Sequence, residues 1–599
     1  MTPTPAIISL GPRSAALALR LRDLLPGSEI HAPDCADCTA DVRFAKATAH
    51  LAQLFASGRA IVGLCASGIL IRAVASRLGD KSAEPPVVAV AEDGSAVVPL
   101  LGGHHGANTL ARTIATALGV APAITTAGDN RFGLALDEPP RGWTLANPAH
   151  AKQVMARLLE GEPVRLTAAA GDVGWLRSGG LPTAEDAALE LLVTPEARPG
   201  SAECLVYHPP VLALGVGTEA GAPADALDRL AASVLAEHGL AAASVACVVS
   251  IDLKAAEPAV HELAARLGVP ARFFAAERLL KETPRLASPS EVVLRETGCW
   301  GVAEGAALAA VGLAGRLLAP KRKGERVTCA IAASPHDLDP QAIGRPQGRL
   351  AVVGLGPGDL RWRTGEAQRL LAEAEELVGY GLYLDLIGPA AVGKPRHEFP
   401  LGAEVERCRF ALARAAEGRA VALVCSGDPG IYALATLVFE LLENAADAAW
   451  ARVAVTVSPG VSALQAAAAV AGAPLGHDFC AISLSDLLTP VEVIEQRVRA
   501  AAHGDFVIAF YNPVSLRRRE LLGRARDLLL EHRPAATPVV LARNLGRPDQ
   551  TTHTVTLAEL TADMCDMLTL VLVGATGTRR APRLHGPDWI YTPRGYRVA

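Results

Sequence analysis

The sequence LAVVGLGPGD at residues 350–359 joins a short apolar run to a glycine-rich turn. Apolar residues followed by turn residues predict a buried strand that ends near Gly354. Glycine-rich turns after strands often bind dinucleotides. Here, however, Pro357 removes a backbone amide and Asp359 adds a negative charge, so the turn disfavours a phosphate group. We therefore expect this turn to face a positively charged ligand.

Two further glycine-containing turns follow along the chain. The apolar run from Val421 to Val424 predicts another strand, and the sequence SGDPGIY at residues 426–432 follows it with a second carboxylate, Asp428. A third turn, SPGVSA, occupies residues 458–463. Both carboxylate-bearing turns suit a cationic ligand, because opposite charges attract.

Together these turns resemble those of the tetrapyrrole methylases, which methylate uroporphyrinogen and precorrins. The resemblance covers residues 349–599 and implies two α/β subdomains, at about 349–460 and 461–599, with S-adenosylmethionine bound in a cleft. It also implies a homodimer formed through this domain. The cofactor contacts that it implies are Pro357, Gly427, Asp428, Pro429, Ile431, Tyr432, Ser462, Ala463, Asn512 and Ala542.

The segment YNPVSLRRR at residues 511–519 is most similar to the precorrin-3B C17-methyltransferases within that family. These enzymes convert precorrin-3B to precorrin-4 and contract its ring. A precorrin carries carboxylates on its rim, and arginine pairs with carboxylates through a planar fork. A solvated helix face is the alternative for any one of the three consecutive arginines, which cannot all point the same way. The expected substrate contacts are Arg517, Arg518, Arg519 and Arg543, with Arg396 and His397 as weaker candidates.

The chemistry of methyl transfer from a sulfonium depends mainly on alignment of the methyl group with an electron-rich carbon. Ring contraction adds proton transfers, for which Asp359, His397 and Tyr511 are the candidate acid–base groups. Another tetrapyrrole or an RNA remains an alternative substrate, because one fold serves many reactions.

The size and charge of the chain restrict the remaining possibilities. Its 599 residues predict several domains, and its 50% hydrophobic residues predict globular cores. The net charge of −5 is not gathered into blocks, so no nucleic acid is expected as a partner. No secretory signal or apolar run of about 18 residues is present, which predicts a cytoplasmic protein without a membrane span. Cys35 and Cys38 have zinc-like spacing but lack a second ligand pair, so we expect no metal.

The fold class expected for the whole chain is α/β, with two N-terminal α/β units before a methylase domain of the class III methyltransferase fold. Apolar runs that alternate with helix-like stretches predict these units at residues 1–130 and 211–333. The second should contain a helix over 223–237 and strands over 244–251 and 327–332. The parts between them are predicted to be a connecting module at 131–210, with a possible helix over 184–192, and an exposed linker at 334–348.

The N-terminal units resemble the cobalt-precorrin-5A hydrolases, which open a lactone and release acetaldehyde during corrin synthesis. The first unit carries the resemblance in residues 63–72, 81–88 and 100–108, and the second carries it in residues 215–217, 250–257 and 298–307. The resemblance implies a bifunctional enzyme. Thr218 and Glu219, however, stand where Cys-Arg is common in that family, and the acidic position before Gly94 is shifted. A non-catalytic tetrapyrrole-binding module is therefore the alternative.

Candidate catalytic groups of the N-terminal half are a glycine-flanked histidine and a glutamate. His104 or His105, within GGHHG at residues 102–106, could activate water, since an imidazole titrates near neutral pH. Glu304 could act as a general base, and the alternative is an acidic residue that interacts with the helix dipole. Possible contacts to substrate carboxylates are Arg72, Lys81 and Lys254.

Overall fold

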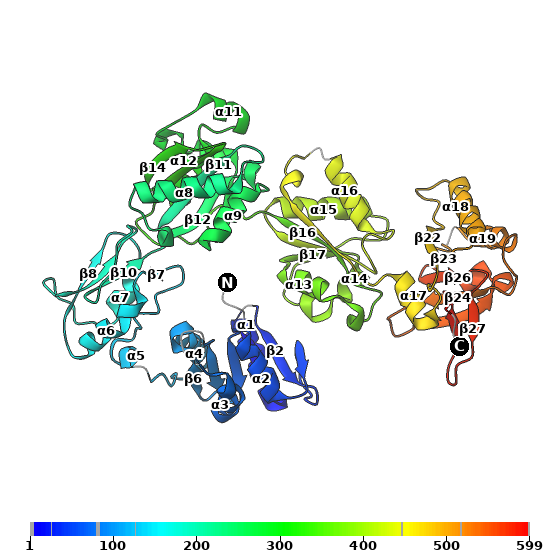
Figure 1. Ribbon diagram of the computed structural model, residues 1–599, viewed down its shortest axis with the longest axis horizontal. Helices are drawn as coiled ribbons and strands as arrows, with labels where there is room; N and C mark the ends of the chain where they lie inside the picture. Colours follow the sequence, from blue (N-terminus) through cyan, green and yellow to red (C-terminus); the bar gives the residue numbers. More distant parts are fainter. Residues whose placement is uncertain are drawn as a thin grey trace.

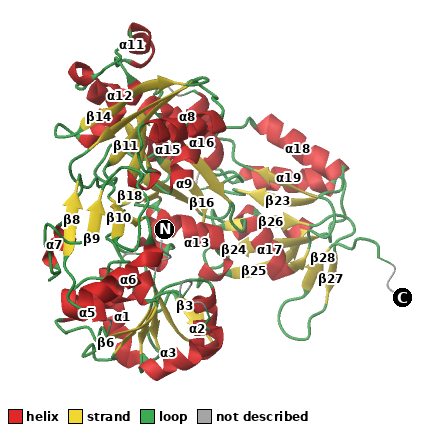
Figure 2. Ribbon diagram, turned by 60° about the vertical axis from the view of Figure 1, so that its left-hand side comes forward, coloured by secondary structure: helices red, strands yellow, loops and turns green. Residues whose placement is uncertain are grey.

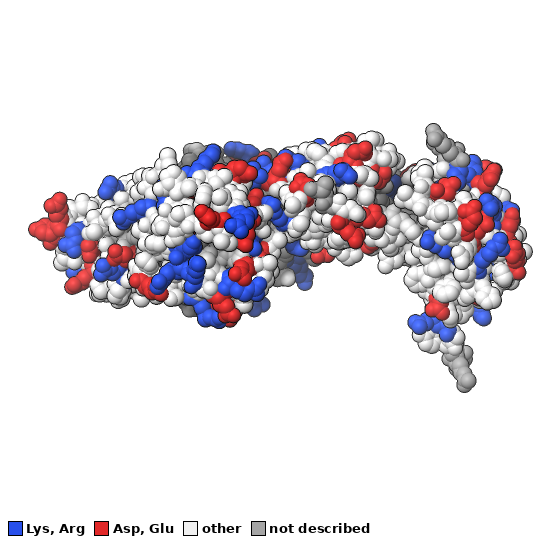
Figure 3. Space-filling view, turned by 90° about the horizontal axis from the view of Figure 1, so that it is seen from above, with Lys and Arg blue, Asp and Glu red and all other residues white. Residues whose placement is uncertain are grey.

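The computed structural model describes residues 5–25, 27–79, 84–125, 127–444, 447–515 and 518–596. Over these residues the chain forms successive sheets flanked by helices (Figures 1 and 2). The expected α/β class is confirmed. No helix of the described residues is long and apolar enough to cross a membrane. Acidic and basic side chains are interspersed on the face that Figure 3 shows.

The first unit is a sheet of order β3-β2-β1-β4-β5-β6, parallel except for β6. Alternate residues of β1 point to opposite faces, so Ile7 packs with α1 and α4 and Ile8 with α2 and α3. The elements are β1 (Ala6–Ser9), α1 (Ala15–Leu24), β2 (Glu29–Pro33), β3 (Val42–Phe44), α2 (Ala47–Ala56), β4 (Ile61–Leu64), α3 (Ser67–Val74), β5 (Val87–Val90), β6 (Val97–Leu101) and α4 (Ala107–Leu118).

The second unit has a sheet and a core of its own, with order β7-β10-β9-β8. The helix suggested for residues 184–192 is wrong, because β9 alternates buried and half-buried residues, the period of a strand. Helix α5 crosses the boundary expected at residue 130, and its Phe132 joins this core. The elements are α5 (Ala127–Phe132), β7 (Thr144–Leu145), α6 (Pro148–Leu159), β8 (Val164–Ala168), α7 (Gly174–Ser178), β9 (Leu189–Val193) and β10 (Cys204–His208).

The third unit is a sheet of order β13-β12-β11-β15-β14. The predicted helix and both predicted strands of this unit are present, with ends within one residue of those expected. The elements are β11 (Leu212–Thr218), α8 (Ala224–Glu237), β12 (Val245–Ile251), α9 (Pro258–Leu267), β13 (Ala271–Phe274), α10 (Ala276–Leu280), α11 (Glu291–Thr297), α12 (Val302–Val311), β14 (Arg316–Lys323) and β15 (Val327–Ala333).

The segment at 334–348 is anchored to this third unit along part of its length. The buried guanidinium of Arg272 donates to the carbonyl oxygens of Gln341, Ile343 and Gly344, at 3.1, 2.5 and 3.1 Å. Phe273 and Arg345 exchange two backbone hydrogen bonds of 2.8 Å. A segment without periodic apolar residues can therefore still be fixed by its own carbonyl groups.

The methylase part begins with a parallel sheet of order β18-β17-β19-β16-β20. Strands β16 and β19 lie side by side, so the glycine turns that follow them meet at one edge of the sheet. The elements are β16 (Arg349–Gly354), α13 (Gly365–Glu373), β17 (Glu376–Gly379), α14 (Gly381–Asp385), β18 (Arg396–Glu398), α15 (Glu404–Ala416), β19 (Ala420–Cys425), α16 (Leu434–Glu443) and β20 (Ala454–Ser458).

A second methylase sheet has the order β22-β23-β26-β24-β25, beside a small sheet of β21, β28 and β27. Figure 1 shows these strands together at the C-terminal end of the chain. The elements are α17 (Ala463–Ala471), β21 (Gly472–Ala473), β22 (Phe479–Ser483), α18 (Val491–His503), β23 (Val507–Tyr511), α19 (Glu520–Leu530), β24 (Pro538–Arg543), β25 (Thr551–Thr556), β26 (Thr569–Val573), β27 (Arg579–Ala581) and β28 (Trp589–Tyr591).

Candidate active site

A cavity of about 230 Å³ lies between the two methylase sheets. Residues of both sheets and their connecting turns form its wall, as expected for a ligand site between two subdomains. The lining residues are Pro357, Tyr383, Ser426, Gly427, Asp428, Ile431, Ser462, Ala463, Tyr511, Asn512, Ala542, Asn544, Leu545, Arg547, Met567, Leu568, Thr569 and Leu570.

The glycine turns of the first sheet are held together by their backbones. The amide of Gly356 donates to the carbonyl oxygen of Gly427 at 3.2 Å, and the amide of Gly427 donates to that of Gly356 at 2.8 Å. A Cβ atom on Gly460 would lie only 2.1 Å from the Gly427 oxygen. The three turns can pack this closely only because these positions lack side chains.

The carboxylate of Asp428 fixes these turns as well as lining the cavity. One of its oxygens accepts a hydrogen bond from the amide of Gly430 at 2.8 Å, and the other accepts one from the amide of Gly460 at 3.2 Å. The expected negative charge is therefore present at the cavity and held in place.

The second sheet contributes Tyr511 and Asn512 at the end of β23. The phenol oxygen of Tyr511 accepts a hydrogen bond from the amide of Leu464 at 3.2 Å, and burial raises the pKa of this phenol. Asn512 has a positive φ of 50° and donates to the Ser483 hydroxyl at 3.1 Å. Ser462 caps α17 through a capping box. These contacts fix the orientation of the cavity wall.

Two of the predicted cofactor contacts, Pro429 and Tyr432, lie outside the cavity lining, as do two of the predicted acid–base groups, Asp359 and His397. Asp359 caps a short helix and pairs with Arg361 at 2.7 Å, which lowers the pKa of its carboxyl group. The ring of Tyr432 lies beside that of Tyr511, with centroids 5.3 Å apart and an angle of 54° between the ring planes, and its hydroxyl donates to the carbonyl oxygen of Ala481 at 2.9 Å.

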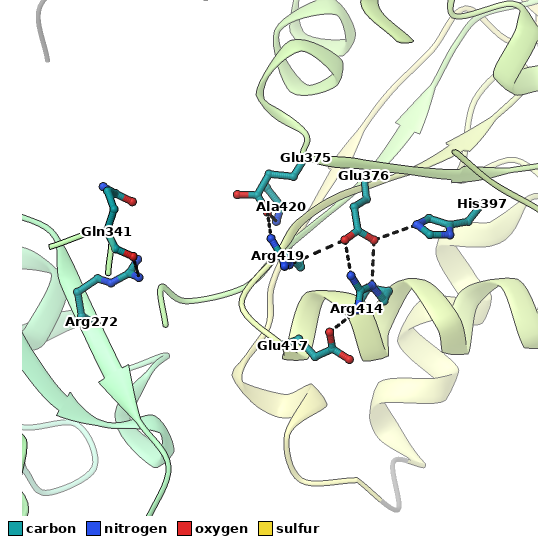
Figure 4. A network of polar contacts seen from close by, with 9 residues as sticks. All are labelled: Arg272, Gln341, Glu375, Glu376, His397, Arg414, Glu417, Arg419 and Ala420. Carbon is teal, nitrogen blue, oxygen red and sulfur yellow. Dashed lines mark hydrogen bonds and ion pairs between the residues drawn. The ribbon is translucent and has the colours of Figure 1, made fainter. Parts of the chain in front are cut away.

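His397 belongs to a polar network around Glu376, the first residue of β17 (Figure 4). Its Nε2 lies 3.0 Å from the carboxylate of Glu376, which Arg414 contacts at 2.5 and 2.9 Å. The ion pair with Arg414, followed by the contact to His397, lowers the pKa of Glu376 against the opposing effect of burial. The arrangement joins β17, β18 and α15 and serves the fold.

Replacing Glu376 with glutamine is expected to lower the free energy of unfolding by about 2 kcal/mol at neutral pH, because a buried, charged hydrogen-bond partner is lost. The folded-state pKa of this carboxyl group lies below its ordinary value of about 4.5. The contribution of the Glu376 carboxylate to the free energy of unfolding is therefore complete above this ordinary pKa. It disappears as the pH falls through the lowered pKa of the folded state. Chemical unfolding measured from neutral to acid pH should show that the difference in free energy of unfolding between wild type and variant becomes smaller.

Glu375 provides the matched control for this change. Its side chain is 52% exposed and pairs with Arg419 at 3.7 Å, so Glu375→Gln should cost at most about 1 kcal/mol. Equal losses for both variants, or a loss for Glu376→Gln that does not depend on pH, would contradict the assignment.

The predicted substrate arginines are already paired with protein groups. Arg518 contacts Asp486 at 3.3 Å and the carbonyl oxygen of Asn512 at 3.2 Å. Arg519 pairs with Asp563 at 2.8 Å. Arg543 pairs with Asp566 at 2.6 Å and Asp549 at 3.4 Å, and Arg396 with Asp385 at 2.7 Å. Arg517 lies outside the described residues.

The cavity also contains residues that the sequence analysis missed. Arg547 and Tyr383 are the polar members of this set with long side chains, and the set also includes Ser426, Asn544, Leu545 and residues 567–570. The glycine at position 546, three residues after the end of β24, was the available signal for a ligand-facing turn.

The candidate residues of the N-terminal half are distributed over two units. Glu304 is 2% exposed and accepts hydrogen bonds from the amides of Ala287, Ser288 and Lys321, at 2.8, 3.0 and 2.8 Å. His105 is exposed on a short 3₁₀ helix of the first unit.

Among the other N-terminal candidates, Arg72 is exposed and Lys254 is half-buried. Arg72 donates to the carbonyl oxygen of Gly68 at 3.2 Å, and Lys254 lies 4.0 Å from Glu257. Lys81 and the side chain of His104 lie outside the described residues.

Comparison with known proteins identifies the parts of the chain. The tetrapyrrole (corrin/porphyrin) methylase family model matches residues 349–561. The models of the cobalamin synthesis G N-terminal and C-terminal regions match residues 49–129 and 212–332.

Individual relatives match the C-terminal part along almost their whole length. A precorrin-3B C(17)-methyltransferase of Sinorhizobium sp is 45% identical over 256 residues, 42% of this chain and 98% of that protein. A probable cobalt-factor III C(17)-methyltransferase of Salmonella typhimurium is 43% identical over 249 residues, 42% of this chain and 100% of that protein. The solved structure of the methyltransferase CobJ is 45% identical, covers 41% of this chain and 100% of that chain, and has a TM-score of 0.39.

Both resemblances inferred from the sequence are thereby confirmed. The chain is a methyltransferase of the tetrapyrrole methylase family that carries a cobalamin synthesis G-type region ahead of its methylase domain.

Proposed function

We propose that the methylase domain catalyses the S-adenosylmethionine-dependent C17 methylation and ring contraction of precorrin-3B to precorrin-4. The observation that carries this proposal is the cavity, whose wall includes most residues that the family resemblance assigns to the cofactor. The Sinorhizobium relative, which bears the name of this reaction, supports the choice of substrate.

The chemical character of the cavity suits this cofactor. Asp428 provides a carboxylate beside the apolar side chains of Ile431 and Ala463, so a sulfonium charge would meet an opposite charge next to apolar surface. Ser462 and Asn512 add groups that can hydrogen-bond to a nucleoside. When bound, S-adenosylmethionine supplies an electrophilic methyl group.

The residues of the chain contribute alignment and one candidate proton donor. The mutually bonded turns at Gly356 and Gly427 hold one wall rigid, which favours a reactive alignment of the ligands. Tyr511 retains a proton at Oη, because burial raises its pKa, and it lines the cavity. We therefore prefer Tyr511 to Asp359 and His397 for proton transfer during ring contraction.

Incubation of the full-length protein with precorrin-3B and S-adenosylmethionine under anaerobic conditions tests this proposal. We expect a C17-methylated, ring-contracted product by mass spectrometry and NMR. Parallel reactions contain cobalt-factor III, named for the Salmonella relative, and RNA. Turnover of cobalt-factor III alone would assign a metallated substrate instead, and methylation of RNA alone would overturn the proposal.

We also propose that the N-terminal region hydrolyses the lactone of cobalt-precorrin-5A. The family matches at residues 49–129 and 212–332 support this second activity. The full-length protein should release acetaldehyde from cobalt-precorrin-5A, measured by reduction with a coupled alcohol dehydrogenase. Tight binding of the tetrapyrrole without acetaldehyde would make this region a binding module.

We further propose that the enzyme works as a cytoplasmic homodimer joined through the methylase domain. Domain boundaries are proposed before α5 and after residues 210, 333 and 348, because none of the described sheets has strands on both sides of any of these positions. Light scattering that gave the mass of one chain at assay concentration would refute the dimer.

A further inference from the structure

Arg547 is a basic residue on the wall of the cavity that no sequence pattern singled out. It follows β24 on a turn closed by the hydrogen bond from its own amide to the carbonyl oxygen of Asn544, at 3.2 Å. Two residues of this turn, Asn544 and Gly546, have positive φ angles of 52° and 71°. The turn therefore presents the Arg547 side chain to the cavity on a defined backbone.

The guanidinium of Arg547 has spare capacity for hydrogen bonds. Its Nη1 donates to the side-chain oxygen of Asn544 at 3.1 Å, whereas its Nε is buried and has no partner. No carboxylate in the part of the chain that the structure describes forms an ion pair with it. A guanidinium carries five N–H donors, so the side chain of Arg547 can also donate to an acceptor on a ligand in the cavity that it lines.

The nearby acidic residues are engaged elsewhere. Asp359, on the neighbouring glycine turn, pairs with Arg361 at 2.7 Å. Asp549 pairs with Arg543 at 3.4 Å and also accepts a hydrogen bond from Asn544. Asp428, on the wall of the same cavity, binds the amides of Gly430 and Gly460, so none of these three carboxylates pairs with Arg547.

Tyr383, on α14 beside the first methylase sheet, adds a second polar group. It lines the same cavity, and burial raises the pKa of its phenol, with Arg547 exerting a smaller opposing effect. The phenol therefore stays neutral and can donate a hydrogen bond near Arg547. A donor from α14 and a donor from the turn after β24 thus line the same cavity.

We propose that Arg547 binds a carboxylate group of the ligand in this cavity. The inference rests on the proposed function, since both S-adenosylmethionine and precorrin-3B carry carboxylates. The planar guanidinium can pair with a carboxylate through two hydrogen bonds. Arg518, Arg519 and Arg543 are less suited to this role, because protein carboxylates already occupy them.

Isothermal titration of the full-length protein tests the cofactor as the source of the carboxylate. The probes are S-adenosylhomocysteine and 5′-methylthioadenosine, which lacks the amino acid and its carboxylate. If Arg547 binds the cofactor, Arg547→Gln should lower the affinity for S-adenosylhomocysteine about 10- to 100-fold and leave the affinity for 5′-methylthioadenosine unchanged. Arg547→Lys should restore part of the loss, because it keeps the charge without the planar fork.

Steady-state kinetics test the substrate as the source. If Arg547 binds the macrocycle, Arg547→Gln should raise the KM for precorrin-3B about 10- to 100-fold at saturating cofactor and leave the affinity for S-adenosylhomocysteine unchanged. The matched control is Arg499→Gln, since Arg499 lies on α18, is 54% exposed and pairs with Glu531 at 3.8 Å. Neither readout should change for this control.

Two outcomes would overturn the assignment of Arg547. One is that Arg547→Gln changes neither the affinity for S-adenosylhomocysteine nor the KM for precorrin-3B. The other is that Arg547→Gln lowers the affinities for S-adenosylhomocysteine and 5′-methylthioadenosine equally, which would indicate a purely structural role. Failure of the wild-type protein to bind S-adenosylhomocysteine would instead count against the proposed function.

Discussion

Replacing Gly460 with alanine is expected to abolish methyl transfer and to weaken binding of S-adenosylhomocysteine about 100-fold or more. The new Cβ atom would lie 2.1 Å from the carbonyl oxygen of Gly427 and 3.0 Å from the backbone of Gly354. These are backbone atoms of two turns, which cannot rotate away as a flexible side chain can. The turns must separate, at a cost of about 3 kcal/mol, the upper part of the usual range for overpacking. Each 1.4 kcal/mol corresponds to about a tenfold change in affinity. A distortion of this size in the cavity wall should therefore lower the affinity for S-adenosylhomocysteine about 100-fold or more.

Gly365→Ala is the matched control for this substitution. Gly365 begins α13 in the same sheet domain, and a Cβ atom there would meet no atom within 4 Å. Alanine is also the better helix former, so the control should be as stable as wild type or slightly more so. Titration calorimetry and thermal unfolding of both variants give the comparison. Wild-type affinity in Gly460→Ala would show that the contact between the turns does not shape the site.

The turns of this site could be predicted because their residue types restrict the backbone. The run at residues 350–353 marks a buried strand, and the glycines and prolines after it exclude a helix. Strand β19 and its turn are recognised in the same way. Their adjacency in space follows from the parallel pairing of β16 with β19, which the spacing along the chain does not reveal.

The choice among arginines could not be predicted, because it depends on neighbours that are distant in sequence. Arg543 and Arg547 are four residues apart and chemically identical, yet Asp566 pairs with Arg543, while Arg547 faces the cavity. Residues 567–570 line the cavity because β26 pairs with β24. A partner on another strand thus decides which basic side chain is left available to a ligand.

The role of a buried acid in the N-terminal half likewise depends on neighbours that are distant in sequence. Near the start of α12, Glu304 could be interpreted from sequence as a general base or as a residue that favours the helix dipole. The three amides that it binds come from the loop at 287–288 and from β14, and neither is predictable from its own neighbours in the chain.

Replacing Glu304 with alanine is expected to destabilise the unit at residues 211–333 by about 3 kcal/mol or more. The carboxylate is 2% exposed, and its removal would leave the amides of Ala287, Ser288 and Lys321 without an acceptor. Each unsatisfied buried amide costs about 1–3 kcal/mol, and water can reach some of them once the side chain is gone. Glu304→Gln should be milder, because it keeps one acceptor oxygen. Thermal unfolding and hydrogen exchange at these three amides measure the effect.

The contrast with an exposed acid decides between a structural and a catalytic role for Glu304. Glu296 is exposed on α11, so Glu296→Ala should leave both unfolding and amide protection unchanged. If Glu304 holds the fold, loss of protection at the three amides should accompany any loss of acetaldehyde release. If Glu304→Gln instead kept wild-type stability and protection but released no acetaldehyde, the carboxylate would be needed for chemistry. The geometry favours the first result, because both carboxylate oxygens of Glu304 already accept backbone hydrogen bonds.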